Sequence, residues 1–204
     1  MIDLGTGDGT FAYQSARRNP KKFYIGVDPN PRPLEKISEK IHRKPAKGGA
    51  PNVLFIQSAV EDLPSELDGV ADEVHIHFPW GSLLGAAVTG DKAFLQNVHR
   101  ICAAGALLEV IIGLDPDRDR SEIVRLDLPA LTLDYFDNDL GRKYEEAGFS
   151  VLRRGLLPAS EWAKLESSWA KKLAGRQERS VLYFVARVFK DAPADENIGP
   201  THFN

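Results

Sequence analysis

Three alternating glycines near the start of the chain are its strongest local signal of chemistry. They are Gly5, Gly7 and Gly9 in the stretch DLGTGDGT (residues 3–10), which follows a short apolar piece and precedes helical sequence. Glycine lets the backbone turn tightly and approach a ligand closely, and the start of a helix offers free N–H groups. A dinucleotide-binding loop, G-x-G-x-x-G, would need glycine where Thr10 stands. The pattern acid-x-G-x-G-x-G therefore indicates a ligand loop of another kind.

Two later segments carry acids at positions that complete a nucleoside site. Asp28 ends the strand-like segment FYIGVD, about 20 residues past the glycine loop, where a carboxylate can accept hydrogen bonds from both ribose hydroxyls. The stretch SAVEDLP (58–64) follows the next strand-like segment and offers Ala59, Val60 and Glu61 to an adenine base. In order and spacing these pieces resemble the S-adenosylmethionine (SAM) site of class I methyltransferases. We therefore expect SAM as the cofactor.

Two tryptophans lie in settings that disfavour the core. Trp80 stands between Pro79 and Gly81, which end a strand-like segment, and Trp169 lies in the polar stretch ESSWAKKL (166–173). Two facing indoles can hold one flat ring, and stacking is worth about 1–3 kcal/mol per base. That gain offsets the cost of flipping a base out of folded RNA, which is a few kcal/mol. The pair therefore predicts an aromatic clamp for a nucleobase.

Strand-like and helical segments alternate along the chain, which predicts a doubly wound α/β sheet. Its last strands follow one another closely and favour an antiparallel end. The expected strands are 23–28, 53–57, 72–77, 106–112, 149–154 and 180–189, and the expected helices are 9–18, 33–43, 91–103, 134–147 and 159–166. Residues 1–190 read as one domain and 191–204 as a flexible tail. Only Met1 and Ile2 precede the glycine loop, so we expect the first, central strand to be truncated and upstream sequence to be missing.

Composition narrows the class of protein. The 204 residues are 43% hydrophobic, carry a net charge of −3 and contain one cysteine. No disulfide framework or zinc-type cysteine cluster can form, and no apolar run approaches the roughly 20 residues that cross a membrane. We expect a cytoplasmic monomer without a membrane partner. We also expect no metal: His75 and His77 alternate on one strand face and suit packing, and Asp134, Asp137 and Asp139 suit a helix cap and first turn.

Five motifs, in order, resemble one enzyme family over residues 2 to about 189. They are DLGTGDG, FYIGVDPN, KPAKGGAPNV, FPWGSLL and SSWAKKL. They are similar to the aminoglycoside-resistance 16S ribosomal RNA methyltransferases that modify N1 of adenine 1408. The resemblance implies a class I, Rossmann-like fold with a mostly parallel seven-stranded sheet. It also implies 16S rRNA of the assembled 30S subunit as substrate and potential drug resistance as the outcome.

The resemblance assigns roles to individual residues. It implies that Trp80 and Trp169 hold the flipped adenine, with Ser82 and Ser167 lining the same pocket. The residues expected at the cofactor are Asp3, Gly5, Thr6, Gly7, Asp8, Asp28, Pro29, Asn30, Ala59, Val60, Glu61, Phe78, Trp80 and Ser82. Those expected at RNA are Lys40, Arg43, Lys44, Arg125, Lys172 and Arg179.

Departures from the family pattern concern the ends and the basic surface. The family's N-terminal extension is absent, and Glu39, Gln177 and Leu126 stand where basic residues are usual, with Arg125 adjacent to Leu126 as a substitute. These changes weaken the RNA-binding surface and leave the cofactor and base pockets intact.

Adenine N1 carries an in-plane lone pair, so its methylation needs no general base and depends on positioning the reactants at about 3–3.5 Å. Two other functions are compatible with the sequence. One is a transfer-RNA guanine-N7 methyltransferase, which also has a Phe-Pro…Trp motif after the fourth strand. The other is a weakly active or non-catalytic protein that binds SAM and the ribosome.

Overall fold

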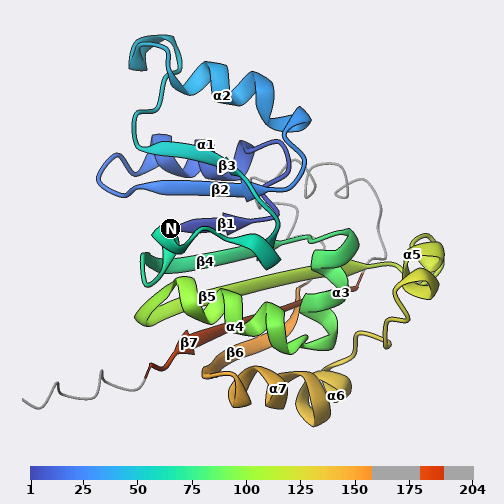
Figure 1. Ribbon diagram of the computed structural model, residues 1–204. Helices are drawn as coiled ribbons and strands as arrows, with labels where there is room; N and C mark the ends of the chain where they lie inside the picture. Colours follow the sequence, from blue (N-terminus) through green and yellow to red (C-terminus); the bar gives the residue numbers. More distant parts are fainter. Residues whose placement is uncertain (158–179, 191–204) are drawn as a thin grey trace, which may run out of the picture.

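The computed structural model describes residues 1–157 and 180–190. Residues 158–179 and 191–204 lie outside the described part and are drawn in grey in Figure 1. The expected helix 159–166, the tail 191–204 and the predicted site residues Ser167, Trp169, Lys172 and Arg179 therefore lie outside the described residues.

One twisted sheet of seven strands forms the centre of the described chain, in the order β3-β2-β1-β4-β5-β7-β6 (Figure 1). Neighbouring strands are parallel except at β7, which runs antiparallel to both β5 and β6. The predicted α/β sheet with an antiparallel end is confirmed, with the antiparallel strand lying one place in from the edge. The strands are Ile2–Leu4 (β1), Tyr24–Asp28 (β2), Val53–Gln57 (β3), Ala71–His77 (β4), Cys102–Leu114 (β5), Phe149–Leu157 (β6) and Ser180–Val188 (β7).

Strand β1 has only three residues, yet it occupies the middle of the sheet. All three side chains are buried. Ile2 pairs with Ile25 of β2 on one side and with Val74 of β4 on the other. Pairing on both sides satisfies the short strand's backbone groups and carries the glycine loop into the centre of the sheet.

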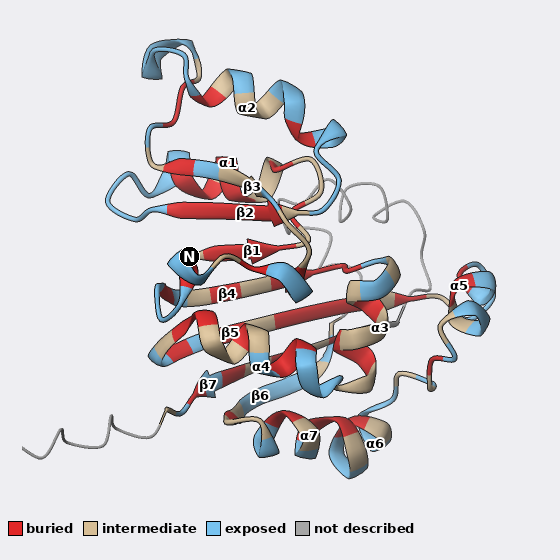
Figure 2. Ribbon diagram, in the orientation of Figure 1, coloured by how far each residue is buried: buried red, intermediate tan, exposed pale blue. Residues whose placement is uncertain are grey.

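Helices cover both faces of the sheet. A large core lies between the sheet and helices α3, α4 and α7, and a smaller one lies beneath α1 and α2 on the other face. Figure 2 shows the buried residues concentrated along the strands and on the inner sides of the helices. The α-helices are Thr10–Arg18 (α1), Glu35–Ile41 (α2), Gly81–Thr89 (α3), Lys92–Ile101 (α4), Arg120–Arg125 (α5), Leu133–Tyr135 (α6) and Gly141–Glu146 (α7).

Shorter helical turns complete the fold. The 3-10 turns are Arg32–Leu34 (η1), Pro45–Lys47 (η2), Val60–Asp62 (η3) and Ser65–Leu67 (η4), and a π-helical turn, Phe136–Leu140 (η5), joins α6 to α7. The expected helix cap and first turn are present at α6. The hydroxyl of Thr132 caps the helix by accepting a hydrogen bond from the Tyr135 N–H, and Asp134 lies in the first turn. Within the described residues, no helix is both long enough and apolar enough to span a membrane.

Parallel strands place their carboxyl ends at one edge, where an α/β sheet binds its ligands. The turns that follow β1, β2, β3 and β4 therefore meet at that edge. These turns contain most of the residues that the sequence assigned to the cofactor, and the fourth turn ends at Trp80.

Candidate functional site

The turn after β1 is built around left-handed glycines. Gly5 has φ +74° and Gly7 has φ +60°, a conformation that side chains rarely adopt. A Cβ at Gly5 would lie 2.6 Å from the side chain of Leu83, whereas a Cβ at Gly7 would meet nothing within 4 Å. Glycine at position 5 therefore suits the positive φ and avoids crowding the Leu83 side chain of α3, and Gly7 exposes the backbone to open space where a ligand can approach.

Asp28 ties this turn to the end of β2. One carboxylate oxygen accepts a hydrogen bond from the Gly7 N–H at 2.9 Å, and the other accepts one from the Asn30 N–H, also at 2.9 Å. Each oxygen keeps a further lone pair. A half-buried carboxylate held in this way is preorganised to accept hydrogen bonds from a sugar diol.

Asp3 supports the turn from below. Its buried carboxylate accepts a hydrogen bond from the Thr6 hydroxyl. Burial raises the pKa of Asp3, and the nearby His77 and the Thr6 hydroxyl act in the opposite direction. At the far end of the turn, Asp8 accepts a hydrogen bond from the Thr10 N–H at 3.1 Å where α1 begins. Asp3, Thr6 and Asp8 thus shape the glycine turn.

A small pocket opens beside the glycine turn. Six of the predicted cofactor residues line it: Gly5, Pro29, Ala59, Val60, Glu61 and Ser82. Sequence reasoning missed Val27, Ser58, Leu83 and Phe94, which complete the lining. Val27 lies in the predicted strand that ends at Asp28, which was a usable signal. Leu83 belongs to a helix that was not predicted, so no signal pointed to it. Apolar walls with polar groups at the rim suit a flat heterocycle joined to a sugar.

The strand-end turn at Phe78–Gly81 projects Trp80 away from the core. Phe78 has φ +49°, a strained value for a bulky residue, and Gly81 has φ +62°. The Phe78 ring is buried against Ile111 and Val181, so it anchors the turn and does not line the pocket. Trp80 is 45% exposed at the start of α3. The structure thus places an accessible indole at the edge where the pocket opens.

Helix α5 contacts this turn and the helix that follows it. The buried carboxylate of Glu122 accepts two hydrogen bonds from Arg125, at 2.8 and 2.7 Å. The pKa of Glu122 is lowered, chiefly by Arg125 and also by the backbone N–H of Gly81. The side chain of Leu126 lies close to α3, since a Cβ added at Gly85 would be 3.5 Å from it. Arg125, predicted to contact RNA, is therefore oriented by an acid that also reaches the turn carrying Trp80.

The predicted basic residues Lys40, Arg43 and Lys44 lie elsewhere. They are at the end of α2 and in the turn after it, next to the start of β3. The Lys40 ammonium stands 4.5 Å from the centre of the Tyr13 ring, and Arg43 and Lys44 are exposed. This turn is at the amino ends of the strands, and the pocket is at their carboxyl ends (Figure 1). Among the predicted RNA-binding residues that the structure describes, these three therefore lie apart from Arg125.

The acidic residues considered for a metal site do not gather. Asp137 pairs with Arg154, and Asp139 lies 2.8 Å from Lys143. The predicted common face of His75 and His77 is confirmed, since both rings contact Glu109 of the adjacent strand.

Comparison with known proteins gives consistent matches along the chain. Residues 1–188 match the profile of the NpmA family, described as 16S rRNA (adenine(1408)-N(1))-methyltransferase. A protein of that name from Escherichia coli is 37% identical over 193 residues, covering 93% of this chain and 87% of the relative.

Two solved structures are also similar. The aminoglycoside resistance methyltransferase NpmB1 is 45% identical, with a TM-score of 0.78, covering 92% of this chain and 85% of that one. A tryptophan-to-alanine mutant of the 16S rRNA (adenine(1408)-N(1))-methyltransferase from Catenulisporales acidiphilia, solved with cosubstrate SAM, is 35% identical with a TM-score of 0.84. It covers 94% of this chain and 86% of that one.

Proposed function

Because the chain belongs to the family of 16S rRNA (adenine(1408)-N(1))-methyltransferases, we propose that it transfers a methyl group from SAM to N1 of adenine 1408. The observation that carries the proposal is the pocket beside the glycine turn, whose lining includes residues that follow four parallel strands and the first turn of α3, where Trp80 is exposed. Methylation at this position is expected to confer resistance to aminoglycosides.

The residues present fit SAM. Asp28, held by two backbone N–H groups, would accept hydrogen bonds from the ribose hydroxyls, and the open backbone at Gly7 would face the methionine part. Val60 and Leu83 would enclose the adenine, with Glu61 at the rim. When bound, the cosubstrate supplies an electrophilic methyl group on a sulfonium. The protein's task is to hold it with that methyl directed at the base.

The target base needs positioning rather than activation. Neutral adenine N1 is already nucleophilic, and transfer leaves a cationic base, so no side chain has to remove a proton. Trp80, together with Trp169, would clamp the flipped adenine, and Ser82 and Ser167 would orient its edge. Fixing both reactants in advance can supply much of the rate enhancement.

The substrate is proposed to be the assembled 30S subunit. Basic side chains stand at both ends of the sheet, so one small molecule in the pocket could not contact all of them. A folded RNA surface can span both groups. We further propose that the enzyme acts as a monomer in the cytoplasm, where ribosomal subunits are found.

One experiment separates this proposal from the two alternatives. The purified chain is incubated with methyl-labelled SAM and, in parallel, with 30S subunits, protein-free 16S rRNA or bulk transfer RNA. The proposal predicts label in the 30S subunits. Label confined to transfer RNA would favour guanine-N7 methylation. SAM binding without label in any RNA would indicate a non-catalytic binding protein.

A further inference from the structure

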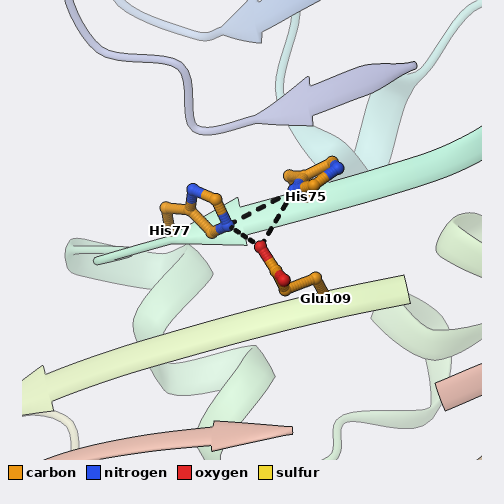
Figure 3. Close-up of side chains that lie close together, drawn as sticks. All are labelled: His75, His77 and Glu109. Carbon is orange, nitrogen blue, oxygen red and sulfur yellow. Dashed lines mark hydrogen bonds and ion pairs between the residues drawn. The ribbon is translucent and has the colours of Figure 1, made fainter. Parts of the chain in front are cut away.

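Three polar side chains meet on one face of the sheet, beside the buried Asp3 that supports the glycine turn. His75 of β4 is in register with Asp3 of β1 and with Glu109 of β5, and His77 lies two residues further along β4 on the same face. Figure 3 shows both rings directed at one oxygen of Glu109. None of the three lines the cofactor pocket. The group is therefore not explained by the proposed methyl transfer.

The three ligand-type atoms are close together. His75 Nδ1 lies 3.1 Å and His77 Nε2 lies 2.7 Å from Glu109 Oε1, and the two nitrogens are 3.3 Å apart. Phe11 of α1 packs on both imidazoles, with ring centres 4.7 Å from His77 and 5.5 Å from His75. The rings are thus held in place by an aromatic neighbour as well as by the carboxylate.

Hydrogen bonding between neutral imidazoles and Glu109 satisfies this group poorly. If both rings are neutral and donate to Glu109, the bare Nε2 of His75 faces a carboxylate oxygen of Glu73 at 3.8 Å, so two acceptors oppose each other. Glu73 is in turn fixed by Lys22 at 2.7 Å. Nδ1 of His77 is buried and has no hydrogen-bond partner among the described residues.

We propose that His75, His77 and Glu109 bind a divalent first-row transition metal ion, with Zn²⁺ as the reference. Two imidazoles and one carboxylate, with a position left for water, form a donor set that such ions accept. Ligands of a tetrahedral ion with bonds of about 2.0–2.1 Å are about 3.3 Å apart. The three distances here do not exceed that value, so an ion can reach all three atoms with little movement.

Metal binding at Nδ1 of His75 would also give the Nε2 atom of that ring a favourable partner. The proton then resides on Nε2, where it faces the carboxylate of Glu73. A carboxylate behind a metal-bound histidine orients the ring and strengthens the ligand. His77 lacks such a partner for Nδ1, so we expect affinity in the micromolar rather than the nanomolar range. The ion would link β4 to β5 just before the turn that carries Trp80. This inference replaces the expectation that the two histidines only pack.

Metal titration tests the site without any activity assay. The metal-free chain is titrated with Zn²⁺ by calorimetry and with Co²⁺ by visible absorption, which reports the coordination of the ion. We expect one ion per chain and a Co²⁺ spectrum of a four- or five-coordinate site. His75→Gln and Glu109→Gln should each weaken Zn²⁺ binding at least tenfold. His42→Asn, which removes an exposed histidine, should leave it unchanged and so controls for surface binding.

The outcomes decide the proposal in either direction. SAM affinity and thermal unfolding are measured on every variant, so that a loss of metal binding is interpreted only in a variant that is folded. One folded glutamine variant with weakened Zn²⁺ binding is enough to support the site. Failure of the wild-type chain to bind Zn²⁺ at concentrations well above micromolar would overturn the site. Equal Zn²⁺ affinity in wild type, His75→Gln and Glu109→Gln would overturn it as well.

Discussion

Trp80 shows at the level of a single residue how the fold prepares a ligand contact. Its neighbours Phe78 and Pro79 are buried, yet Trp80 itself is 45% exposed. The strained backbone at Phe78 turns the chain out of β4, and the buried Phe78 ring holds that turn. A strained conformation persists only where surrounding packing supports it, and such sites are often functional. We therefore propose that a ligand covers the exposed indole.

Removal of either indole should separate catalysis from cofactor binding. We expect Trp80→Ala and Trp169→Ala each to abolish methyl transfer to 30S subunits, because both indoles are proposed to hold the base. SAM affinity should stay within a few-fold, because Trp80, although also expected at the cofactor, does not line the described pocket. Calorimetry and transfer of labelled methyl groups check the two effects. Phe23→Ala removes another exposed aromatic ring, 48% exposed and at the opposite edge of the sheet, and should change neither. A large loss of SAM binding in Trp80→Ala would refute the assignment.

Asp28 should behave in the opposite way. Asp28→Asn removes a charged acceptor that holds the Gly7 N–H and is proposed to hold the ribose. Hydrogen bonds to charged groups are worth about 1.5–3 kcal/mol, and 1.4 kcal/mol is tenfold in affinity, so SAM binding should weaken about 10- to 100-fold. Calorimetry measures this loss. Asp62→Asn, a nearby exposed acid outside the pocket lining, serves as the matched control. Equal affinities in the two variants would contradict the proposed role.

Among the secondary-structure elements, helix α5 links the loop after β5 to the Trp80 turn. Glu122 is buried and pairs with Arg125 through two hydrogen bonds, while the Arg125 side chain is 58% exposed. Because solvent screens that partner, the pair contributes little to stability, and its loss should shift the melting temperature by only a few degrees.

Substitution of Glu122 should therefore have a pH-dependent cost. The pKa of Glu122 is lowered in the folded chain, so its stabilising contribution is present above the unfolded pKa of about 4.3 and is lost as pH falls through the folded value. Glu122→Gln should lower the melting temperature by a few degrees at pH 7, and the difference should shrink in increasingly acidic buffer. Thermal unfolding at several pH values checks this. A difference that is constant with pH would mean that the carboxylate's charge is unimportant.

The elements also show what the sequence could and could not predict. Strands β2, β3 and β4 were placed within about one residue because their apolar runs end at clear turn signals. Helix α3 was missed since its sequence, GSLLGAAVT, is apolar nearly all round and shows no helical period. Pro79 and Gly81 were read as ending a strand, which is correct, but Gly81 also begins the helix. The short helix α5 was also missed, because the aspartates around it favour loops.

Part of the pocket beside the glycine turn was also predicted. Local motifs pointed to Gly5 and the 58–61 stretch, which line the pocket, and to Asp28, which ends β2 and accepts a hydrogen bond from Gly7. The role of Leu83 depended on an unpredicted helix. The contact of Glu109 with His75 and His77 depends on the register between β4 and β5, which joins residues more than 30 positions apart. Pairing of that kind cannot be read from local pattern.

For the molecule as a whole, the distribution of basic residues decides how it meets RNA. Lys40, Arg43 and Lys44 stand at one end of the strands and Arg125 near the other. Arg125 is also engaged by Glu122, so the α2 turn is the better place to test phosphate contacts. We propose that both places contact RNA phosphates, which a large folded RNA can span and a small substrate cannot.

Charge reversal in the α2 turn should weaken binding to the subunit. Each phosphate contact contributes about one to the slope of log affinity against log salt, so Lys44→Glu should lower affinity and reduce that slope by about one. Filter binding to 30S subunits at several salt concentrations measures both. Lys92→Glu makes the same change at the start of α4, which packs on the opposite face of the sheet, and should have little effect. An unchanged slope in Lys44→Glu would remove this turn from the interface.

The most direct test of the central claim locates the methyl group. Purified 30S subunits are incubated with the chain and SAM, and reverse transcriptase is then run across the decoding region. Methylation of N1 blocks Watson–Crick pairing, so the account predicts a strong stop next to adenine 1408 that requires SAM and is absent with Trp80→Ala. Incorporation of label with no stop at that adenine, or with a stop at a different base, would contradict it.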